Sequence, residues 1–452
     1  MCNKPMNPVG NFNGRNGVRQ KANISNGVNR RVFLKAAASA AVMPYVITTS
    51  ALGAAGKPPA SERIVMGCIG MGGQGTAGMG WRSAGPDVPN TGWVPKGGFM
   101  ARGVHVVAVC DVNKNNLNRA KFIVDQEYGN NDCTAYKHYR ELLARQDIDI
   151  IICATGDRWH TPISIAAAKA GKDVYCEKPI SLTVYEAREL ARAFRQYGRI
   201  FQTGTQQRSA REFRFACELV RNRYIGELKH ITVNVGGGPQ ECNLPAGGPP
   251  PDWLDYDIWL GQAPWRPFHP GLLGWMAWRD YSGGEMTNWG AHHFDIAQWG
   301  TGFEHSGPVE IIPPDGKDFQ VLTYKYANGV TMTREGTCNG VKFEGSKGWV
   351  EVNRGYLQTQ PESLLRQKIG PDEIRLHVST DHHIDFLNAV RNRTCPASDA
   401  DIGYRSISVC HLGNIAYWLK RPLKWDPANE KFVNDPEADR MLWREMRSPY
   451  RI

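Results

Sequence analysis

The sequence predicts an α/β protein in which a parallel, doubly wound sheet is followed by an α+β domain with a large, mainly antiparallel open sheet. Apolar, strand-like runs alternate with helical patterns between residues 60 and 204, as in parallel sheets covered by helices. After Leu228 the chain shows paired strand patterns, and Asn328-Gly329 is a two-residue hairpin signal. We therefore expect one domain over residues 60–204 and a second over residues 205–452.

The chain has a basic N-terminal extension. The first 56 residues contribute seven of the 54 Lys and Arg and no acid, so the remaining chain holds 47 basic against 44 acidic residues. This balance gives no indication of a nucleic-acid surface. Residues 29–35, NRRVFLK, precede a mildly apolar run at 36–46, a pattern that resembles a twin-arginine signal. We expect residues 1–56 to direct the folded protein to the twin-arginine export machinery and the periplasm; a disordered basic tail is the alternative.

A glycine motif follows at the start of the first domain. Residues 63–78, RIVMGCIGMGGQGTAG, place Gly70, Gly72 and Gly75 in the spacing G-x-G-x-x-G. Such glycines make a tight turn, admit a pyrophosphate to the backbone and allow the next helix to pack on its strand. The motif predicts a dinucleotide site, although the same spacing also occurs in ordinary turns.

An acid at the end of the second strand supports the dinucleotide interpretation. Residues 104–110, VHVVAVC, end at Asp111, where a carboxylate can accept hydrogen bonds from the adenosine ribose and disfavour a 2'-phosphate. Asp111 lies further along the chain from the glycines than is usual. The extra length is a Pro- and Gly-rich insertion at residues 80–103, which we expect to form a loop. A solvated carboxylate at the strand end is the alternative.

The strand and helix patterns continue to residue 204. Residues 148–154, IDIIICA, form an apolar run expected of a strand covered on both faces. One helix is predicted to begin at Thr161-Pro162, and a capping box of Thr183 and Glu186 marks another. The cysteines in this region show no metal-ligand pairing, so we expect no metal and buried thiols at Cys68, Cys110, Cys153 and Cys176.

Two further stretches carry candidate chemistry. Glu177-Lys178-Pro179 follows a strand at the sheet edge where ligands bind, and Lys178 there could hydrogen-bond a substrate hydroxyl; a solvated lysine is the alternative. Residues 282–299, SGGEMTNWGAHHFDIAQW, place Asn288, His292 and Asp295 on one helical stripe. The adjacent His293 points elsewhere, which disfavours a metal, and His292 is either a structural histidine or a proton acceptor near Lys178.

The segment between residues 239 and 278 is rich in Pro, Gly and Trp. We expect it to form a long loop over the cleft. Its aromatic faces could stack on sugar rings, although Trp also fills protein cores.

Together these motifs resemble the Gfo/Idh/MocA family of glucose-fructose oxidoreductase, inositol 2-dehydrogenase and relatives. The resemblance rests on the glycine motif, AVCDVN around Asp111, residues 154–179 (ATGDRWHTPISIAAAKAGKDVYCEKP), residues 201–209 (FQTGTQQRS) and residues 283–295 (GGEMTNWGAHHFD). It covers essentially everything after the signal and is specific for the family, but not for a substrate.

The resemblance implies roles for individual residues. Lys178 is expected to be the catalytic lysine and His292 the general base. The residues implied at the cofactor are Gly70, Met71, Gly72, Gln74, Gly75, Asp111, Thr155, His160 and Glu177, and those implied at the substrate are Gln206, Arg208 and Asn288. Asn288 stands where the family motif usually has Asp, and an amide cannot carry the charge that would tune His292 or Lys178.

These observations predict an exported, NAD-dependent oxidoreductase that acts on a hydroxyl of a sugar, sugar acid or polyol. We expect NAD rather than NADP, tightly bound, and a homo-oligomer. One alternative is a redox glycosidase that oxidises, eliminates and then reduces. Another is a non-catalytic, sugar-binding relative.

Overall fold

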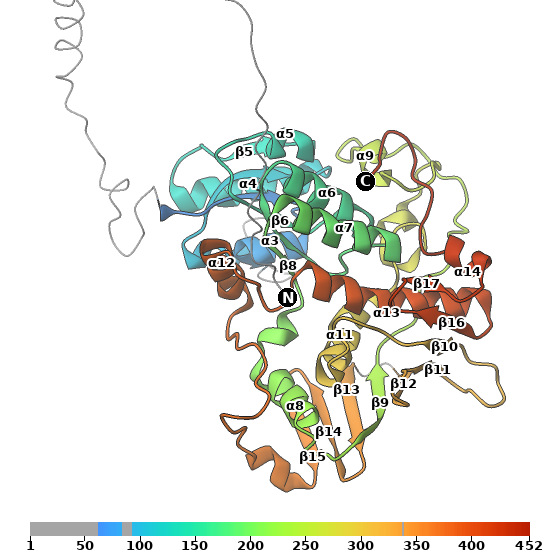
Figure 1. Ribbon diagram of the computed structural model, residues 1–452. Helices are drawn as coiled ribbons and strands as arrows, with labels where there is room; N and C mark the ends of the chain where they lie inside the picture. Colours follow the sequence, from blue (N-terminus) through green and yellow to red (C-terminus); the bar gives the residue numbers. More distant parts are fainter. Residues whose placement is uncertain (1–61, 84–92, 337–338) are drawn as a thin grey trace, which may run out of the picture. The chain divides into compact units, whose positions relative to one another are not determined.

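A six-stranded parallel sheet forms the first part of the chain (Figure 1). The computed structural model describes residues 62–83, 93–336 and 339–452, so the predicted signal at residues 1–56 lies outside the described residues. The strands run in the order β5-β4-β1-β6-β7-β8. They are β1 (Val65–Ile69), β4 (His105–Cys110), β5 (Thr134–Tyr136), β6 (Ile150–Cys153), β7 (Asp173–Cys176) and β8 (Phe201–Thr203).

The strand order reverses at β1. From β1 the chain first builds outward through β4 and β5, and then returns to add β6, β7 and β8 on the other side. In doubly wound sheets this reversal opens a crevice at the carboxyl ends of the strands. The predicted parallel sheet is confirmed, and its crevice lies beside the glycine motif.

Five helices connect these strands. They are α3 (Gly73–Met79), α4 (Lys114–Tyr128), α5 (Tyr139–Leu143), α6 (Asp157–Lys169) and α7 (Val184–Tyr197). The Thr183 hydroxyl caps α7 by accepting a hydrogen bond from Glu186 N, as predicted, while the Glu186 carboxylate reaches back to Leu182 N. The predicted start of α6 is wrong. The helix begins at Asp157, because the Thr161 hydroxyl donates to Ile180 O instead of capping the helix.

A nine-stranded sheet forms the second part of the chain, in the order β15-β14-β13-β9-β12-β11-β10-β16-β17. All neighbours are antiparallel except β9 and β12. Its strands are β9 (Leu228–Asn234), β10 (Glu310–Ile312), β11 (Leu322–Lys325), β12 (Thr331–Glu335), β13 (Gly340–Gly345), β14 (Gly348–Asn353), β15 (Tyr356–Gln360), β16 (Leu423–Asp426) and β17 (Lys431–Phe432). The predicted hairpin at Asn328-Gly329 joins β11 to β12, with Gly329 at a positive φ of 85°. The predicted large, mainly antiparallel sheet is confirmed.

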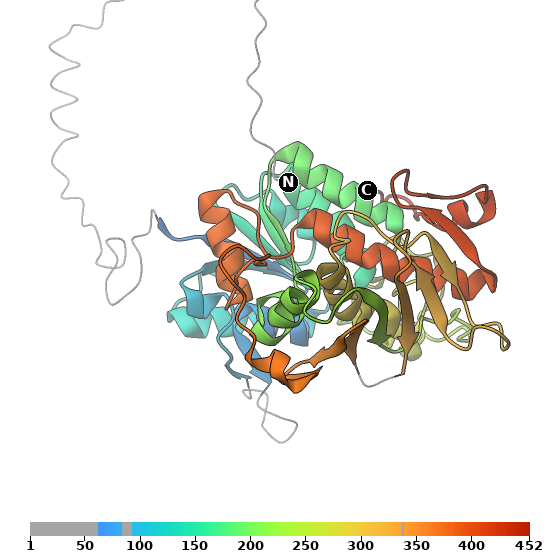
Figure 2. The same ribbon diagram turned by 60° about the horizontal axis from the view of Figure 1, so that its bottom comes forward.

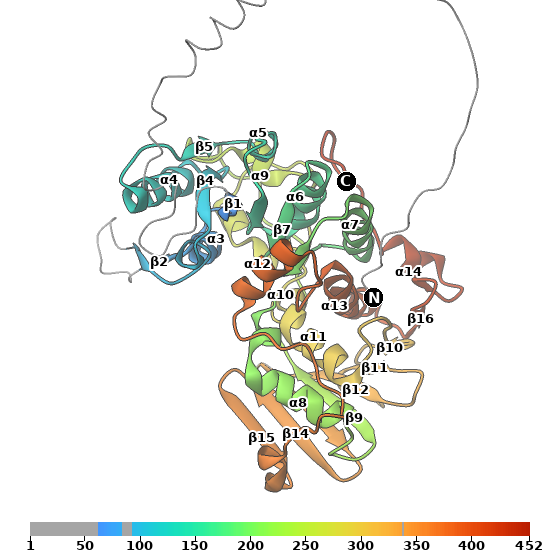
Figure 3. The same ribbon diagram turned by 60° about the vertical axis from the view of Figure 1, so that its left-hand side comes forward.

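Helices α8 and α11 pack on this sheet, and α13 joins the two parts of the fold (Figures 2 and 3). Helix α13 contacts α7 and β8 on one side and α11 and β10 on the other. The helices of this region are α8 (Arg211–Arg221), α9 (Tyr256–Leu260), α10 (Glu285–Asn288), α11 (Gly290–Thr301), α12 (His382–Asn392), α13 (Ala400–Leu419) and α14 (Pro436–Arg440). Short 3-10 turns include η3 (Gln206–Ser209) and η6 (Glu362–Arg366), and β2 (Trp81–Ser83) pairs with β3 (Trp93–Pro95).

Residues 64–452 form one compact unit. Its main apolar cluster includes Ile151 of the parallel sheet, Ile231 of the second sheet and Ile407 of α13. None of the helices in the described residues is both long and apolar enough to cross a membrane.

A buried ion network ties η3 to α11. The guanidinium of Arg208 donates to both carboxylate oxygens of Asp295, at 2.6 and 2.8 Å, and to Glu304 at 2.7 Å. It also lies 4.8 Å from the ring centroid of Trp299. The Arg208 and Asp295 side chains are each only 1 % exposed, so neither charge can be solvated if its partner is removed.

We therefore predict that Arg208→Gln lowers the free energy of unfolding by about 3–5 kcal/mol, because it leaves the Asp295 carboxylate buried without its cation. Urea denaturation measures the change. Arg211→Gln, on the exposed face of the next helix, is the matched control and should change stability by less than about 0.5 kcal/mol. A loss below about 1 kcal/mol for Arg208→Gln would contradict a mainly structural role.

Candidate active site

The glycine motif forms the turn between β1 and α3. Gly70 has a φ of +84°, and a Cβ at this residue would approach the Ala154 carbonyl group at the end of β6 to 2.6 Å. A Cβ on Gly75 would collide with the Gly70 carbonyl oxygen, whereas a Cβ on Gly72 would meet no atom within 4 Å. The first and third glycines are thus required by packing, and the second leaves open space, as a bound pyrophosphate needs.

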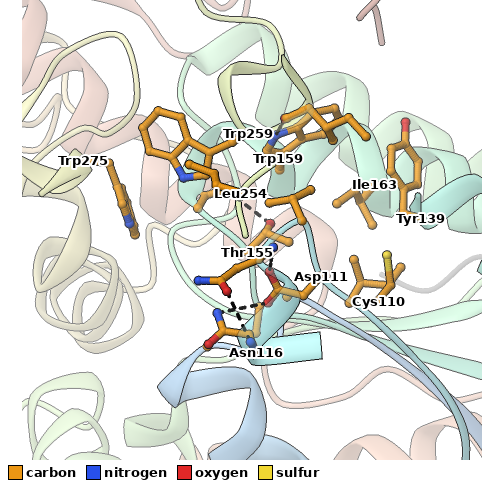
Figure 4. Close-up of a pocket in the computed structure, with 18 of the residues that line it drawn as sticks. Cys110, Asp111, Asn116, Tyr139, Thr155, Trp159, Ile163, Leu254, Trp259 and Trp275 are labelled. Carbon is orange, nitrogen blue, oxygen red and sulfur yellow. Dashed lines mark hydrogen bonds between the residues drawn. The ribbon is translucent and has the colours of Figure 1, made fainter. Parts of the chain in front are cut away.

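A cavity of about 500 Å³ opens next to this turn (Figure 4). We call it the nucleotide cavity; Gly70, Gly72, Gln74 and Asp111 line one part of it, and Trp259 and Trp275 another. Its size is within the range of small-molecule sites. Among the residues predicted for the cofactor, Thr155 also lines it.

Asp111 is held at the end of β4 by main-chain donors. Its carboxylate accepts hydrogen bonds from Met71 N at 2.6 Å and Asn113 N at 2.7 Å. Burial raises the pKa of Asp111, and the two main-chain N-H groups oppose that shift. Arg119 approaches the same turn and donates to Met71 O at 2.8 Å, but only the acid lines the cavity.

The Trp-rich segment at residues 239–278 lines one side of the nucleotide cavity, and we call it the strap. Lys114 N donates to Trp253 O at 2.8 Å, and Asp255 N donates to Val112 O at 3.0 Å. The strap therefore bonds directly to the chain that follows Asp111. The predicted long loop thus covers the sheet crevice, on its nucleotide side (Figure 4).

Arg158 binds the strap through Trp259, a contact that the sequence motifs did not indicate. This buried guanidinium donates to Trp259 O and lies 4.4 Å from the Trp259 ring and 4.9 Å from the Tyr281 ring. Its neighbour Asp157 accepts from the Ser282 hydroxyl at 2.7 Å, and burial raises the pKa of Asp157 to about 6. The sequence did contain an indication of these two charged residues, because Asp157 and Arg158 lie within residues 154–179, the stretch that follows β6 and resembles the family.

A second cavity of about 500 Å³ lies on the other side of Gln74. We call it the polar cavity; its lining includes Gln74, Glu177, Gln206, Gln207, Arg354 and His383. Gln74 also lines the nucleotide cavity. The two cavities therefore share a wall.

Glu177 connects the glycine turn with η3. Its Oε1 accepts from Gln74 Nε2 at 3.0 Å and from Gln206 Nε2 at 3.4 Å, and burial raises its pKa. Gln207 is 3 % exposed, and both atoms of its amide lack a hydrogen-bond partner within the described chain. Buried amides are rarely left in this state. Gln207 is thus the better candidate to contact a ligand, although the sequence pointed to its neighbours Gln206 and Arg208.

Lys178 meets Asn288 across 110 residues of sequence. Its ammonium donates to Asn288 Oδ1, and the Asn288 amide in turn donates to the two carboxylate oxygens of Glu285 at 3.2 and 3.3 Å. Burial lowers the pKa of Lys178, and the carboxylates of Glu177, Asp157 and Glu285 oppose that shift. Asn288 is therefore a hydrogen-bond partner of Lys178, a contact that its helical spacing did not indicate.

His292 is buried near Lys178. Burial lowers its pKa well below the ordinary value, and the positive charges of Lys178 and Arg354 lower it further. Its Nδ1 has no hydrogen-bond partner among the described residues. His292 is thus a neutral imidazole near pH 7. Asp295, which lies on the same predicted stripe, binds Arg208.

His160 and Arg208 line neither cavity among the described residues, and the same is true of Lys178, Asn288 and His292. His160 places its ring nitrogens 2.6 Å from Pro179 O and 3.0 Å from Thr155 O, so it bridges the ends of β6 and β7. Burial lowers its pKa to about 4. Its ring also lies close to two buried thiols, and ligand-type atoms of His160, Cys153 and Cys176 fall within 4.8 Å of one another.

The fold and this site define a dinucleotide-binding oxidoreductase, and the chain belongs to the Gfo/Idh/MocA family. Residues 66–205 match the oxidoreductase family's NAD-binding Rossmann fold. Residues 242–452 match its C-terminal α/β domain. The two matches together span well over half of the chain.

Three individual relatives share between 18% and 31% of the aligned residues with this chain. A glycosyl hydrolase family 109 protein of Shewanella baltica is 31% identical over 222 residues, which cover 45% of each chain. The match thus spans about half the length of such curated relatives. The structure of myo-inositol 2-dehydrogenase from Lactobacillus plantarum has a TM-score of 0.53 at 21% identity and covers 80% of this chain and 99% of that one. Aldose-aldose oxidoreductase from Caulobacter crescentus has a TM-score of 0.55 at 18% identity, covering 80% and 100%. The two structures show a shared fold.

We predict that alanine substitutions separate the two roles of the glycines. Gly75→Ala should lower Tm by several degrees, because its Cβ collides with Gly70 O. Gly72→Ala should leave Tm of the cofactor-free protein unchanged but weaken dinucleotide binding by about 10-fold or more, because its Cβ fills the space left for phosphates. Calorimetry and titration of NADH fluorescence measure these effects, and equal affinity in Gly72→Ala would contradict the assignment.

Proposed function

We propose that this protein is an NAD-dependent oxidoreductase that acts on a hydroxyl of a sugar, sugar acid or polyol. The observation that carries the proposal is the half-buried Lys178 ammonium, held by Asn288 near a neutral, buried His292. Lys178 directly follows Glu177, whose carboxylate accepts a hydrogen bond from Gln74 in the wall between the two cavities. Similarity to an inositol dehydrogenase and an aldose-aldose oxidoreductase supports this class of substrate.

The side chains have complementary tasks. NAD, when bound, takes the hydride from the substrate carbon. Lys178 is suited to hydrogen-bond the substrate oxygen and to stabilise the negative charge that develops there. His292 is suited to accept the hydroxyl proton, because its imidazole is neutral at neutral pH. Gln206 and Gln207 would position the remaining hydroxyls.

The Asp111 carboxylate supports NAD over NADP, since a 2'-phosphate would meet a half-buried negative charge in the nucleotide cavity. The strap supports tight binding, because it would have to detach from the chain after Asp111 to release a dinucleotide. Retention suits a protein exported by the signal at residues 29–35, since free NAD should be scarce outside the cytoplasm. We propose a periplasmic location and a homo-oligomer on the same resemblance.

A second candidate function is redox glycoside cleavage. In this scheme the enzyme oxidises a ring hydroxyl, eliminates the aglycone and returns the hydride. The similarity to proteins named glycosyl hydrolase family 109 favours it. Lys178 and His292 would serve the oxidation in both schemes, so aglycone release with no net change in cofactor redox state distinguishes them.

We predict that Lys178→Ala abolishes turnover and leaves the cofactor bound, because Lys178 acts on the substrate oxygen rather than on the dinucleotide. The rate should fall about 100-fold or more. Mass spectrometry of the copurified nucleotide and single-turnover reduction of bound NAD are the two measurements. Lys169→Ala, at the exposed end of α6, is the control. Turnover near that of the unmodified protein would show that Lys178 is not catalytic.

Asn288→Asp should move the alkaline limb of the pH profile of kcat/KM to higher pH. The new carboxylate would favour the charged form of Lys178 and so raise its pKa. Because the protonated lysine stabilises the alkoxide, activity would persist to higher pH before Lys178 loses its proton. An unchanged alkaline limb in a folded, cofactor-loaded variant would mean that Lys178 is not the titrating group.

A further inference from the structure

Arg354 brings a cation from the second sheet to the polar cavity. It begins the turn between β14 and β15, and its guanidinium lies 4.8 Å from the ring centroid of Trp289. Within the described chain this guanidinium makes neither a hydrogen bond nor an ion pair. The same Trp289 ring lies 5.7 Å from the His292 ring, centroid to centroid, so Arg354 and His292 flank one tryptophan.

The other charges at the polar cavity form no ion pair with this cation among the described residues, although the Glu177 carboxylate opposes the effect of burial, which lowers the pKa of Arg354. Arg102 also lines the cavity, but it is paired with Asp381. Lys96 lines the cavity too, and its ammonium has no partner within the described residues. Glu177 is the single acid in the described lining. Its Oε1 accepts from Gln74 and Gln206, and its Oε2 is buried without a hydrogen-bond partner among the described residues. Arg354 and Lys96 are both exposed, and these two cations against one buried acid leave the lining with a net positive charge.

The polar cavity also offers neutral recognition groups. The unpartnered amide of Gln207 has one acceptor and two donors, which match sugar hydroxyls. The Arg354 guanidinium lies over the Trp289 ring, and a guanidinium fork binds carboxylate with two parallel hydrogen bonds. The cavity therefore combines a cation with an amide that can bind hydroxyls.

We propose that the substrate is a carboxylated sugar, a uronate or aldonate, whose carboxylate pairs with Arg354. The inference rests on the proposed function, and narrows its substrate class. A monoanion balances the single net charge of the cavity, whereas the second charge of a sugar phosphate would also face Glu177. Arg354 is then the residue that determines specificity between acidic and neutral sugars.

The test compares kcat/KM of the NAD-loaded protein for D-glucuronate, D-galacturonate and D-gluconate with that for D-glucose, D-galactose and glucose 6-phosphate. At least one acid should exceed its neutral parent by about 10-fold or more. Arg354→Gln should remove that preference, mainly by raising KM for the acids. Arg366→Gln, an exposed arginine at the end of η6, should keep the preference.

Calorimetric binding to the NAD-loaded Lys178→Ala variant separates this inference from the proposed function. Uronate binding that is lost on adding Arg354→Gln, with no turnover in the unmodified protein, would support the acidic site and refute the oxidoreductase. Turnover of neutral sugars or glucose 6-phosphate equal to or better than that of the acids would refute the acidic site and leave the oxidoreductase standing. Failure of all the acids to bind would also refute it.

Discussion

The close approach of Gly70 to the end of β6 is the constraint on which the candidate site depends. No side chain fits between the turn after β1 and the Ala154 carbonyl group, and this packing places the turn at the strand reversal of the parallel sheet. Gln74 follows on α3 and lines both cavities. The same contact therefore positions the nucleotide cavity, its wall with the polar cavity and the donor that holds Glu177.

Neighbouring charges determine how strongly burial lowers the pKa values of Lys178 and His292. Removing either group from water disfavours its charged form. The carboxylates of Glu177, Asp157 and Glu285 oppose this effect at Lys178, whereas the cations Lys178 and Arg354 reinforce it at His292. An ammonium beside a neutral imidazole is the combination that alkoxide stabilisation and proton acceptance require.

The second part of the fold completes the site by reaching back to the first. The strap bonds to the residues after Asp111, Asn288 fixes Lys178, and Arg354 comes from a hairpin of the nine-stranded sheet. Helix α13 packs against elements of both parts. The two cavities and the Lys178 site are thus built from residues of both parts of the fold.

Sequence alone determined the features that local chemistry dictates. The spacing of Gly70 and Gly75, the acid after β4 and the lysine after β7 follow from the geometry of strand ends, and these residues lie there. The surroundings of Gln207, Asn288, Arg208 and Arg354 were decided only by tertiary structure. Arg208 meets Asp295 at a separation of 87 residues and Lys178 meets Asn288 at 110, and no periodic pattern encodes contacts between elements so far apart in one sequence.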